Sequence, residues 1–442
     1  MAEPLAAFKN AFKIPELKGR ILFTLLMLAL YRLGCHVPTP GVNGNALAEQ
    51  MGGGGLLQFY DMFTGQAFSN ATIFALGIMP YITASIILSL MIPVVPQLEA
   101  LQKSGAEGQK KITEYTRYGT IVLCIVQSIA ISFYLRQFGA RVVPNPGILF
   151  TIMCVISFTT GTAFIMWLGE QISEFGIGNG ISLIIFTSIV SSLPGATYGL
   201  IQMLSQDQIS MFVMLTLVAL MVAVVMGAIL ITTGHRRIPV QYPRQVRGRG
   251  VVGGQRTYLP LRVNQAGVIP IIFASSLLML PGALTKSVRI DWLANALDYV
   301  FRPDNWPYVV IYAALVIFFS FFYTAITFNP VELADNMKKY GGVIVGVRPG
   351  KATAEYLNHV MTRVTVTGAV ALAFIALMPT FVYAFLNVRN YQVTAFFGGT
   401  SLLILVGVAL DTIKQIEQHL TMRHYDGFGT GTGRIRGRRG RS

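Results

Sequence analysis

Long stretches without aspartate, glutamate, lysine or arginine recur along the whole chain, and they constrain the fold more than any other feature. Each is close to or above the roughly 20 apolar residues that a helix needs to cross a bilayer. Charged residues make up only 12% of the chain, about half the share in a soluble protein. The pattern predicts an all-α polytopic membrane protein. Eight of these stretches are 118–135, 142–169, 175–206, 208–234, 263–285, 305–331, 364–388 and 390–410.

Two further candidate spans, 21–37 and 73–91, precede these eight and bring the number to ten. Before the second lies a short apolar run, 56–63, which follows four glycines and ends in a polar break at 64–72. A run of this length cannot cross the bilayer. A non-spanning segment lies at membrane depth only where protein or a watery cavity surrounds it. The sequence therefore predicts a half-inserted helix inside a helical bundle.

The distribution of basic residues predicts the orientation of the spans. Of the 34 lysines and arginines, 27 lie in segments on the side of the N-terminus, six lie in loops on the other side, and the last is Arg32 in the first span. Because basic residues are enriched in cytoplasmic loops, both termini are predicted to be cytoplasmic. No cleavable signal peptide is visible, so the first span is expected to be retained.

Ten spans divide into two sets of five, and an odd number of spans per half makes the halves inverted relative to each other. Inverted halves usually place a path or site at their interface. The expected organisation is a cytoplasmic amphipathic segment (1–20), an N-terminal half (21–206), a C-terminal half (207–420) and a disordered basic tail (421–442).

Two cytoplasmic loops, 235–263 and 332–363, are too long to be simple connections. The first contains seven arginines and no acid, interleaved with valines and tyrosines, and predicts a projecting β-hairpin with Gly253-Gly254 between its apolar runs. Such a hairpin could dock onto ribosomal RNA or onto an acidic protein surface. The alternative is that it only sets topology and contacts anionic lipid headgroups.

Residues for catalysis or metal binding are not apparent. The three cysteines lack CxxC spacing, the five histidines lack ligand spacing, and no nucleophile–base set stands out. The glycine-rich turn 176–180 follows no strand, so we interpret it as a tight turn that lets the fifth span begin close to its neighbours. Acids are nearly absent from the spans, which argues against a proton-coupled carrier. We predict no enzymatic activity, no cofactor and no metal.

Isoleucines occur four residues apart on two of the predicted helices, at Ile78 and Ile82 and at Ile181 and Ile185. Each pair lies on one helix face. Because β-branched side chains are stiff, such faces could form a narrow apolar gasket. The alternative is that they are ordinary core or lipid contacts.

Eight motifs in a consistent order give the chain a close resemblance to a known family. They are YRLG (31–34), FALGIMPYI (74–82), GNGIS (178–182), RRIPVQY (236–242), LPLRVN (259–264), AGVIP (266–270), GVRPG (346–350) and FGGTSLLI (397–404). The chain resembles the bacterial SecY family, the channel subunits of the general protein translocase.

The resemblance implies ten spans in two inverted five-helix halves around a central pore. A plug at about 56–68 would close the pore. A lateral gate would open between two pairs of spans, the second and third on one side and the seventh and eighth on the other, with Asn264 near this gate. The implied plug side chains are Leu56, Leu57, Phe59, Tyr60, Met62 and Phe63. The implied pore ring is Ile78, Ile82, Ile181, Ile185, Ile272 and Ile404. The implied docking arginines are Arg236, Arg237, Arg244, Arg247, Arg249 and Arg348.

The resemblance also implies a function, which is a channel in the bacterial cytoplasmic membrane that passes unfolded secretory polypeptides and releases membrane segments sideways into lipid. The implied partners are SecE and SecG subunits, the SecA motor ATPase, the ribosome, signal peptides and nascent chains, and anionic lipids. The alternative function is secondary transport of small solutes, which inverted halves with broken helices also support. The arginine-rich hairpin and the lack of intramembrane acids favour the protein channel.

Overall fold

A computed structural model of the chain describes residues 14–50, 61–242, 244–247, 250–253, 256–284, 291–302, 305–386, 393 and 399–429. Within these residues, six helices are individually long and apolar enough to cross a membrane, or seven if one bent pair counts as a single span. The six helices are α7 (Ala106–Arg136), α8 (Ile148–Phe175), α9 (Gly180–Ser205), α10 (Met211–Thr233), α13 (Trp306–Thr327) and α15 (Lys351–Leu386).

The other four predicted spans also contain helices, which are shorter or carry more charge. The bent pair is α5 (Met79–Met91) and α6 (Pro96–Lys103), whose axes differ by 99°. The remaining three are α2 (Pro15–Gly34), α11 (Ile269–Leu284) and α17 (Thr400–Gly429). Each of the ten predicted stretches is therefore represented by a helix.

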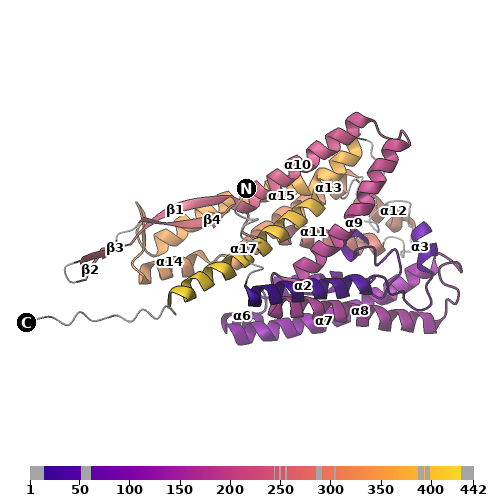
Figure 1. Cartoon of the computed structure of the whole chain (residues 1–442), viewed down its shortest axis with the longest axis horizontal. Coiled ribbons are helices and arrows are strands. Elements are labelled where there is room, and N and C mark those ends of the chain that lie inside the picture. Colours follow the sequence, from indigo (N-terminus) through magenta and orange to yellow (C-terminus); the bar gives the residue numbers. More distant parts are fainter. Residues whose placement is uncertain are drawn as a thin grey trace, which may run out of the picture.

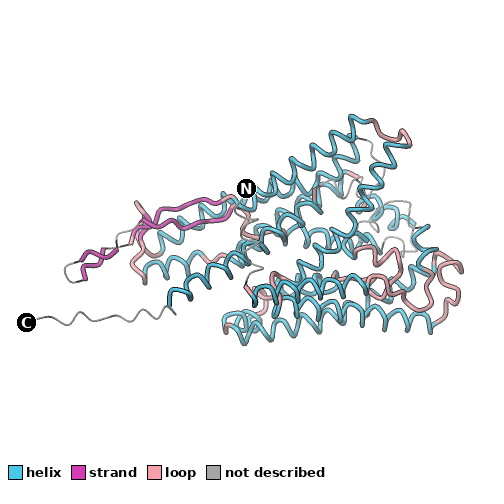
Figure 2. Tube along the Cα trace, in the orientation of Figure 1, coloured by secondary structure: helices cyan, strands magenta, loops and turns pink. Residues whose placement is uncertain are grey.

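The connecting elements gather at the two ends of the bundle (Figures 1 and 2). The strands and α14 (Pro330–Lys339) lie at one end, whereas α3 (Gly44–Gln50) and α12 (Asp291–Phe301) lie at the other. The sequence assigns the loops with strands to the cytoplasm and the loops with α3 and α12 to the opposite side. The arrangement of the elements agrees with this alternation.

The predicted helix over 73–91 is wrong in its first six residues, because α5 begins only at Met79. Gly77 adopts a left-handed conformation (φ 55°), and Pro80 occupies the first turn of α5. A left-handed glycine interrupts a helix, and proline is preferred at its first positions. The apolar composition of 73–78 therefore reflects burial in protein and not helical structure.

The backbone groups of this non-helical segment are paired with neighbouring chain. The Ile73 N–H donates to the Val37 carbonyl at 3.0 Å, and the Thr39 N–H donates to the Ala71 carbonyl at 2.8 Å. Thr72 forms an isolated antiparallel bridge with Pro38. These bonds allow irregular backbone to lie inside the bundle.

The predicted hairpin is confirmed, and it is part of a larger sheet. Strand β1 (His235–Gln241) pairs antiparallel with β4 (Arg256–Arg262), and β2 (Arg244–Arg247) pairs with β3 (Gly250–Gly253) further out. Gly253 is the last residue of β3 and pairs with Arg244 of β2. Strand β5 (Val343–Ile344) from the second long loop pairs with β1, which gives the order β4-β1-β5.

Helices α8 and α17 extend beyond the predicted spans. Helix α8 continues through Phe175, so 170–175 is helical and not a loop. Helix α17 continues to Gly429, into the segment predicted to be disordered. Ile413, Ile416 and Leu420 prolong its apolar spacing, and adding residues to an existing helix costs little. The rest of the predicted tail, 430–442, lies outside the described residues.

Small residues allow close approach of the irregular segment and α8. A Cβ atom added to Gly161 of α8 would overlap the carbonyl oxygen of Ile73. Small residues at helix interfaces permit such backbone contacts in membrane proteins. Gly19 of α2 offers a contrast, because a Cβ atom there would meet nothing within 4 Å.

We expect Gly161→Ala to lower stability by about 1–3 kcal/mol, because the added methyl group overpacks a backbone contact. The matched control is Gly19→Ala, which should be neutral or slightly stabilising because alanine favours a helix. Thermal unfolding of both purified variants in detergent measures the effect. Equal midpoints for the two variants would contradict the packing argument.

Candidate functional site

The six predicted ring isoleucines lie on four helices or directly before one, and they belong to or pack against the large hydrophobic core of the bundle. Ile78 and Ile82 lie at the start of α5, and Ile181 and Ile185 lie in the first turns of α9. Ile272 belongs to α11 and Ile404 to α17. Five of the six are buried, none more than 6% exposed, and Ile181 is half-buried against the same cluster. Their helices pack in pairs, α5 with α11 and α9 with α17.

Two of the predicted plug side chains can be located. Met62 and Phe63 are buried in the same cluster as the isoleucines, at the end of a helical segment that covers 61–64. The other four, Leu56, Leu57, Phe59 and Tyr60, lie outside the described residues. The described part of the predicted plug is thus buried within the protein.

The plug segment touches the C-terminal half of the chain close to the isoleucines. The Met62 sulfur lies 3.3 Å from the Ser401 hydroxyl, which donates to it. Ser401 precedes Ile404 by three residues on α17, so the two side chains lie on the same face. This contact places the end of the plug segment next to one member of the predicted ring.

A polar group that sequence reasoning missed supports the plug segment on its other side. Tyr31 and Arg32 of α2 hydrogen-bond the carbonyl oxygens of Thr64 and Gly65, at 3.2 Å and 2.7 Å. The available signal was Arg32 itself, because a cation within a span is costly and usually has a specific role. Sequence reasoning counted Arg32 but assigned it no partner.

Helices α5 and α11 are the second and seventh of the spans between which the lateral gate is predicted, and they pack against each other. The Ser276 hydroxyl of α11 lies 3.9 Å from the Met79 sulfur of α5, a weak polar contact between otherwise apolar surfaces. Asn264 is buried, and its amide donates to the Gly267 carbonyl at 2.8 Å. That bond orders the turn leading into α11.

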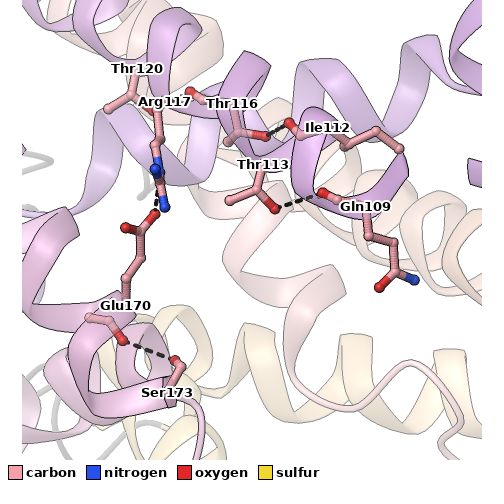
Figure 3. Close-up of polar contacts among 9 residues, drawn as sticks. Gln109, Ile112, Thr113, Thr116, Arg117, Thr120, Glu170 and Ser173 are labelled. Carbon is pink, nitrogen blue, oxygen red and sulfur yellow. Dashed lines mark hydrogen bonds and ion pairs between the residues drawn. The ribbon is translucent and has the colours of Figure 1, made fainter. Parts of the chain in front are cut away.

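An ion pair joins the first half of α7 to the last turns of α8, as Figure 3 shows. The Arg117 guanidinium lies 2.7 Å from the Glu170 carboxylate, and both side chains are partly exposed. Hydroxyl groups along the same helices, such as Thr113 and Ser173, bond to carbonyls of their own helix. Of the contacts drawn in Figure 3, the ion pair is the one that joins the two helices.

The docking arginines that can be placed converge at the three-stranded sheet. Arg236 and Arg237 are exposed on β1, while Ile238 and Val240 of the same strand are buried against α14 and α15. Because β5 pairs with β1, the turn that carries Arg348 follows a strand of the same sheet as Arg236 and Arg237. Sequence reasoning treated these arginines as belonging to two separate loops.

Arg348 is exposed on a tight turn between β5 and α15. Gly346 and Gly350, two residues away on each side, are both left-handed (φ 84° and 99°). The Thr353 hydroxyl donates to the Arg348 carbonyl at 2.8 Å and anchors the turn to α15. Arg244 and Arg247 have described backbone in β2 but no described side chain, and Arg249 lies outside the described residues.

The glycine-rich turn 176–180 has the packing role predicted for it. The Ile177 N–H donates to the Thr24 hydroxyl at 3.0 Å, and the Gly178 N–H donates to the Gln415 side chain at 2.9 Å. A Cβ atom on Gly180 would overlap the Gly169 carbonyl oxygen. The turn therefore connects the start of α9 closely to α2, α8 and α17. Among the described residues, no three His, Cys, Asp or Glu side chains come together as a metal site.

Sequence comparison gives a family for nearly the whole chain. The model of the SecY family matches residues 72–413. The protein translocase subunit SecY of Thermotoga maritima is 45% identical, over 98% of this chain and 99% of that protein. Proteins with the same description from Streptomyces griseus and Haemophilus influenzae are 46% and 44% identical, over 96% and 93% of this chain and 99% and 93% of their own length.

Solved structures with the same fold are more distant in sequence. A structure described as that of a protein conducting channel has a TM-score of 0.66 at 18% identity and covers 93% of this chain and 95% of its own. The canine Sec61 channel in a ribosome–channel complex from the endoplasmic reticulum has a TM-score of 0.62 at 17% identity, with the same coverage. The fold is the predicted one, ten helices in two halves.

The family match, the close relatives over nearly the full length and the shared fold lead to one conclusion: this chain is a multi-pass membrane protein that belongs to the SecY family of protein translocase subunits.

Proposed function

We propose that the six isoleucines seal the resting channel, that the plug segment closes it on the outer side, and that the sheet at the cytoplasmic end docks its partners. Family membership makes the chain a protein-conducting channel and not an enzyme. The alternative of small-solute transport finds no support in the comparisons. The observation that supports the proposed seal is that five of the six isoleucines are buried in the core of the bundle, on helices that pack in the pairs α5 with α11 and α9 with α17.

The seal acts through water exclusion. Stiff apolar side chains make a constriction that disfavours wetting, so ions and small solutes are held back. A translocating chain separates the side chains only while it passes. A signal or anchor segment that is apolar leaves sideways between α5 and α11, because lipid offers about 25 cal/mol for each Å² of apolar surface removed from water. Such a segment shifts the equilibrium toward the open seam, because it binds the open state more tightly than the closed state.

The cytoplasmic arginines supply the docking surface. Arg236 and Arg237 are exposed on β1, and Arg348 is exposed on the turn that follows β5 of the same sheet, which packs on α14 and α15. Phosphates of ribosomal RNA or an acidic surface of a motor ATPase would complement them. One solved structure with this fold, the yeast Ssh1 complex, is described as bound to the 80S ribosome. We infer a cytoplasmic-membrane location with both termini in the cytoplasm, and contacts to anionic lipids at the basic loops.

Replacing Ile82 and Ile185 together with glycine should make the resting channel leak ions, because two members of the seal lose their side chains. We expect at least a ten-fold rise in conductance in planar bilayers. Ile87 and Val190 lie on the same two helices but are exposed, at 43% and 37%. Their double replacement with glycine carries the same helix cost and should leave conductance unchanged. Equal conductance of the two double variants would rule out the seal.

Arg348→Glu should reduce motor-driven export at least ten-fold, since it reverses a charge at the centre of the docking surface. The measurement is precursor translocation into inverted membrane vesicles. Lys111→Glu is the control, because it makes the same charge change on an exposed part of α7 away from the sheet. Binding of the motor should also weaken as salt rises, because screening shortens to about 8 Å at 0.15 M. Normal export by the Arg348 variant would contradict this docking site.

Mild detergent extraction of the chain from bacterial membranes should recover small helical subunits of the SecE and SecG type, because the translocase is expected to be a complex. Mass spectrometry of the purified complex tests this expectation. A chain that purifies alone, yet transports precursor when reconstituted alone, would contradict it.

A further inference from the structure

The C-terminal end of the plug segment is held by two neighbouring side chains of α2. The Tyr31 hydroxyl lies 3.2 Å from the Thr64 carbonyl oxygen, and the Arg32 Nη1 lies 2.7 Å from the Gly65 carbonyl oxygen. Tyr31 and Thr64 are fully buried, and Arg32 is half-buried. Consecutive residues of one helix thus bind consecutive carbonyls of the plug segment.

The same two side chains also bind α9. The Tyr31 hydroxyl lies 2.7 Å from the Ser188 hydroxyl, and Arg32 Nη1 donates to the Ser191 hydroxyl at 3.1 Å. Ser188 and Ser191 are three residues apart, so they lie on one face of α9. The group Tyr31, Arg32, Ser188 and Ser191, here called the clamp, therefore connects the first span, the fifth span and the plug segment.

Backbone conformation makes the two carbonyls available to the clamp. Gly65 and Gln66 are both left-handed (φ 66° and 68°), so the helical segment 61–64 ends there. Carbonyls at the end of a helix lack a partner within the helix and need one elsewhere. A Cβ atom on Gly65 would lie only 3.3 Å from the Ser191 hydroxyl and 3.4 Å from Arg32 Nη1. Clamp and plug segment are therefore closely packed.

The hydrogen bond that Met62 accepts from the C-terminal half is of a weaker kind. It joins the Ser401 hydroxyl to the Met62 thioether, which is a poor acceptor. Hydrogen bonds from a charged donor, such as Arg32, are about twice as strong as neutral ones. Both α2 and α9 belong to the N-terminal half. When the halves separate, the plug segment should stay with the half that binds it more strongly.

We propose that the clamp keeps residues 64–65 attached to the N-terminal half when the channel opens, so that the plug pivots about this point and the contact of Met62 with Ser401 is broken. This inference rests on the proposed function, which assigns 56–68 as the plug. Tyr31, Arg32, Ser188 and Ser191 are then positioning residues for the channel, since they act through the plug segment.

Labelling of a native cysteine next to the clamp can detect whether the clamp has opened. Cys35 is 1% exposed, and its sulfur lies 3.9 Å from the Thr64 carbonyl oxygen. The chain contains two other cysteines, Cys124 and Cys154, which can be replaced with alanine. A membrane-impermeant maleimide added from the outer side then measures access to Cys35 in the assembled translocase, with and without an arrested precursor in the channel.

Two labelling rates separate the outcomes. In a second variant, Cys35 is also replaced and Met62→Cys provides the only thiol. We expect an arrested precursor to raise labelling at residue 62 at least ten-fold and to leave labelling of Cys35 unchanged. A parallel rise at both positions would overturn the pivot, because the clamp would then open with the channel. No rise at residue 62 would instead overturn the plug assignment itself.

Variants of the clamp complete the test. Arg32→Met keeps an apolar chain without its donors, and we expect Cys35 labelling in the resting channel to rise at least ten-fold, with partial rescue in Arg32→Lys. Tyr31→Phe and Ser191→Ala remove single hydroxyls and provide milder variants if Arg32→Met fails to assemble. Thr197→Ala removes a hydroxyl of α9 that bonds only within its helix, to the Leu193 carbonyl, and should have no effect. Labelling of the milder variants equal to this control would overturn the clamp.

Discussion

The structure depends on the requirement that backbone polar groups away from water find partners inside the protein. Helices meet it by themselves, and most of the described bundle is helical. Among the described residues, the segment from Gly65 to Ile78 is an exception, since it is largely buried in the bundle without regular helical structure. Its groups pair with 37–39, with its own turns and with the side chains of Tyr31 and Arg32. Surrounding helices can enclose such a segment because small residues such as Gly161 allow close approach.

Polar side chains also gather beside this irregular segment. A cation and several hydroxyls gather around the end of the plug segment, while the isoleucines nearby provide no polar group at all. The two environments have complementary consequences. In the function proposed above, the apolar constriction would resist water, and the polar group beside it would hold a movable element without a covalent link.

The cytoplasmic end shows how strands can serve a helical membrane protein. Ile238 and Val240 of β1 pack on α14 and α15, Arg237 lies on the opposite face of the strand, and Arg236 is exposed nearer its start, beyond the packed residues. Pairing of β5 with β1 unites two loops that are far apart in sequence. A charged surface formed in this way has defined geometry, whereas the same charges on separate loops would not.

The sequence by itself determined the membrane class, the ten spans, their alternation and the hairpin, because hydropathy, charge and strand patterning are local properties that each segment carries alone. Its motifs also pointed to the family. Only the tertiary structure decided that 73–78 is not helical, that β5 joins the hairpin, and that Tyr31 and Arg32 bind Thr64 and Gly65. Those outcomes depend on partners dozens of residues away or more. Apolar composition records that a residue is buried, but it does not record which backbone conformation or which neighbour satisfies its polar groups.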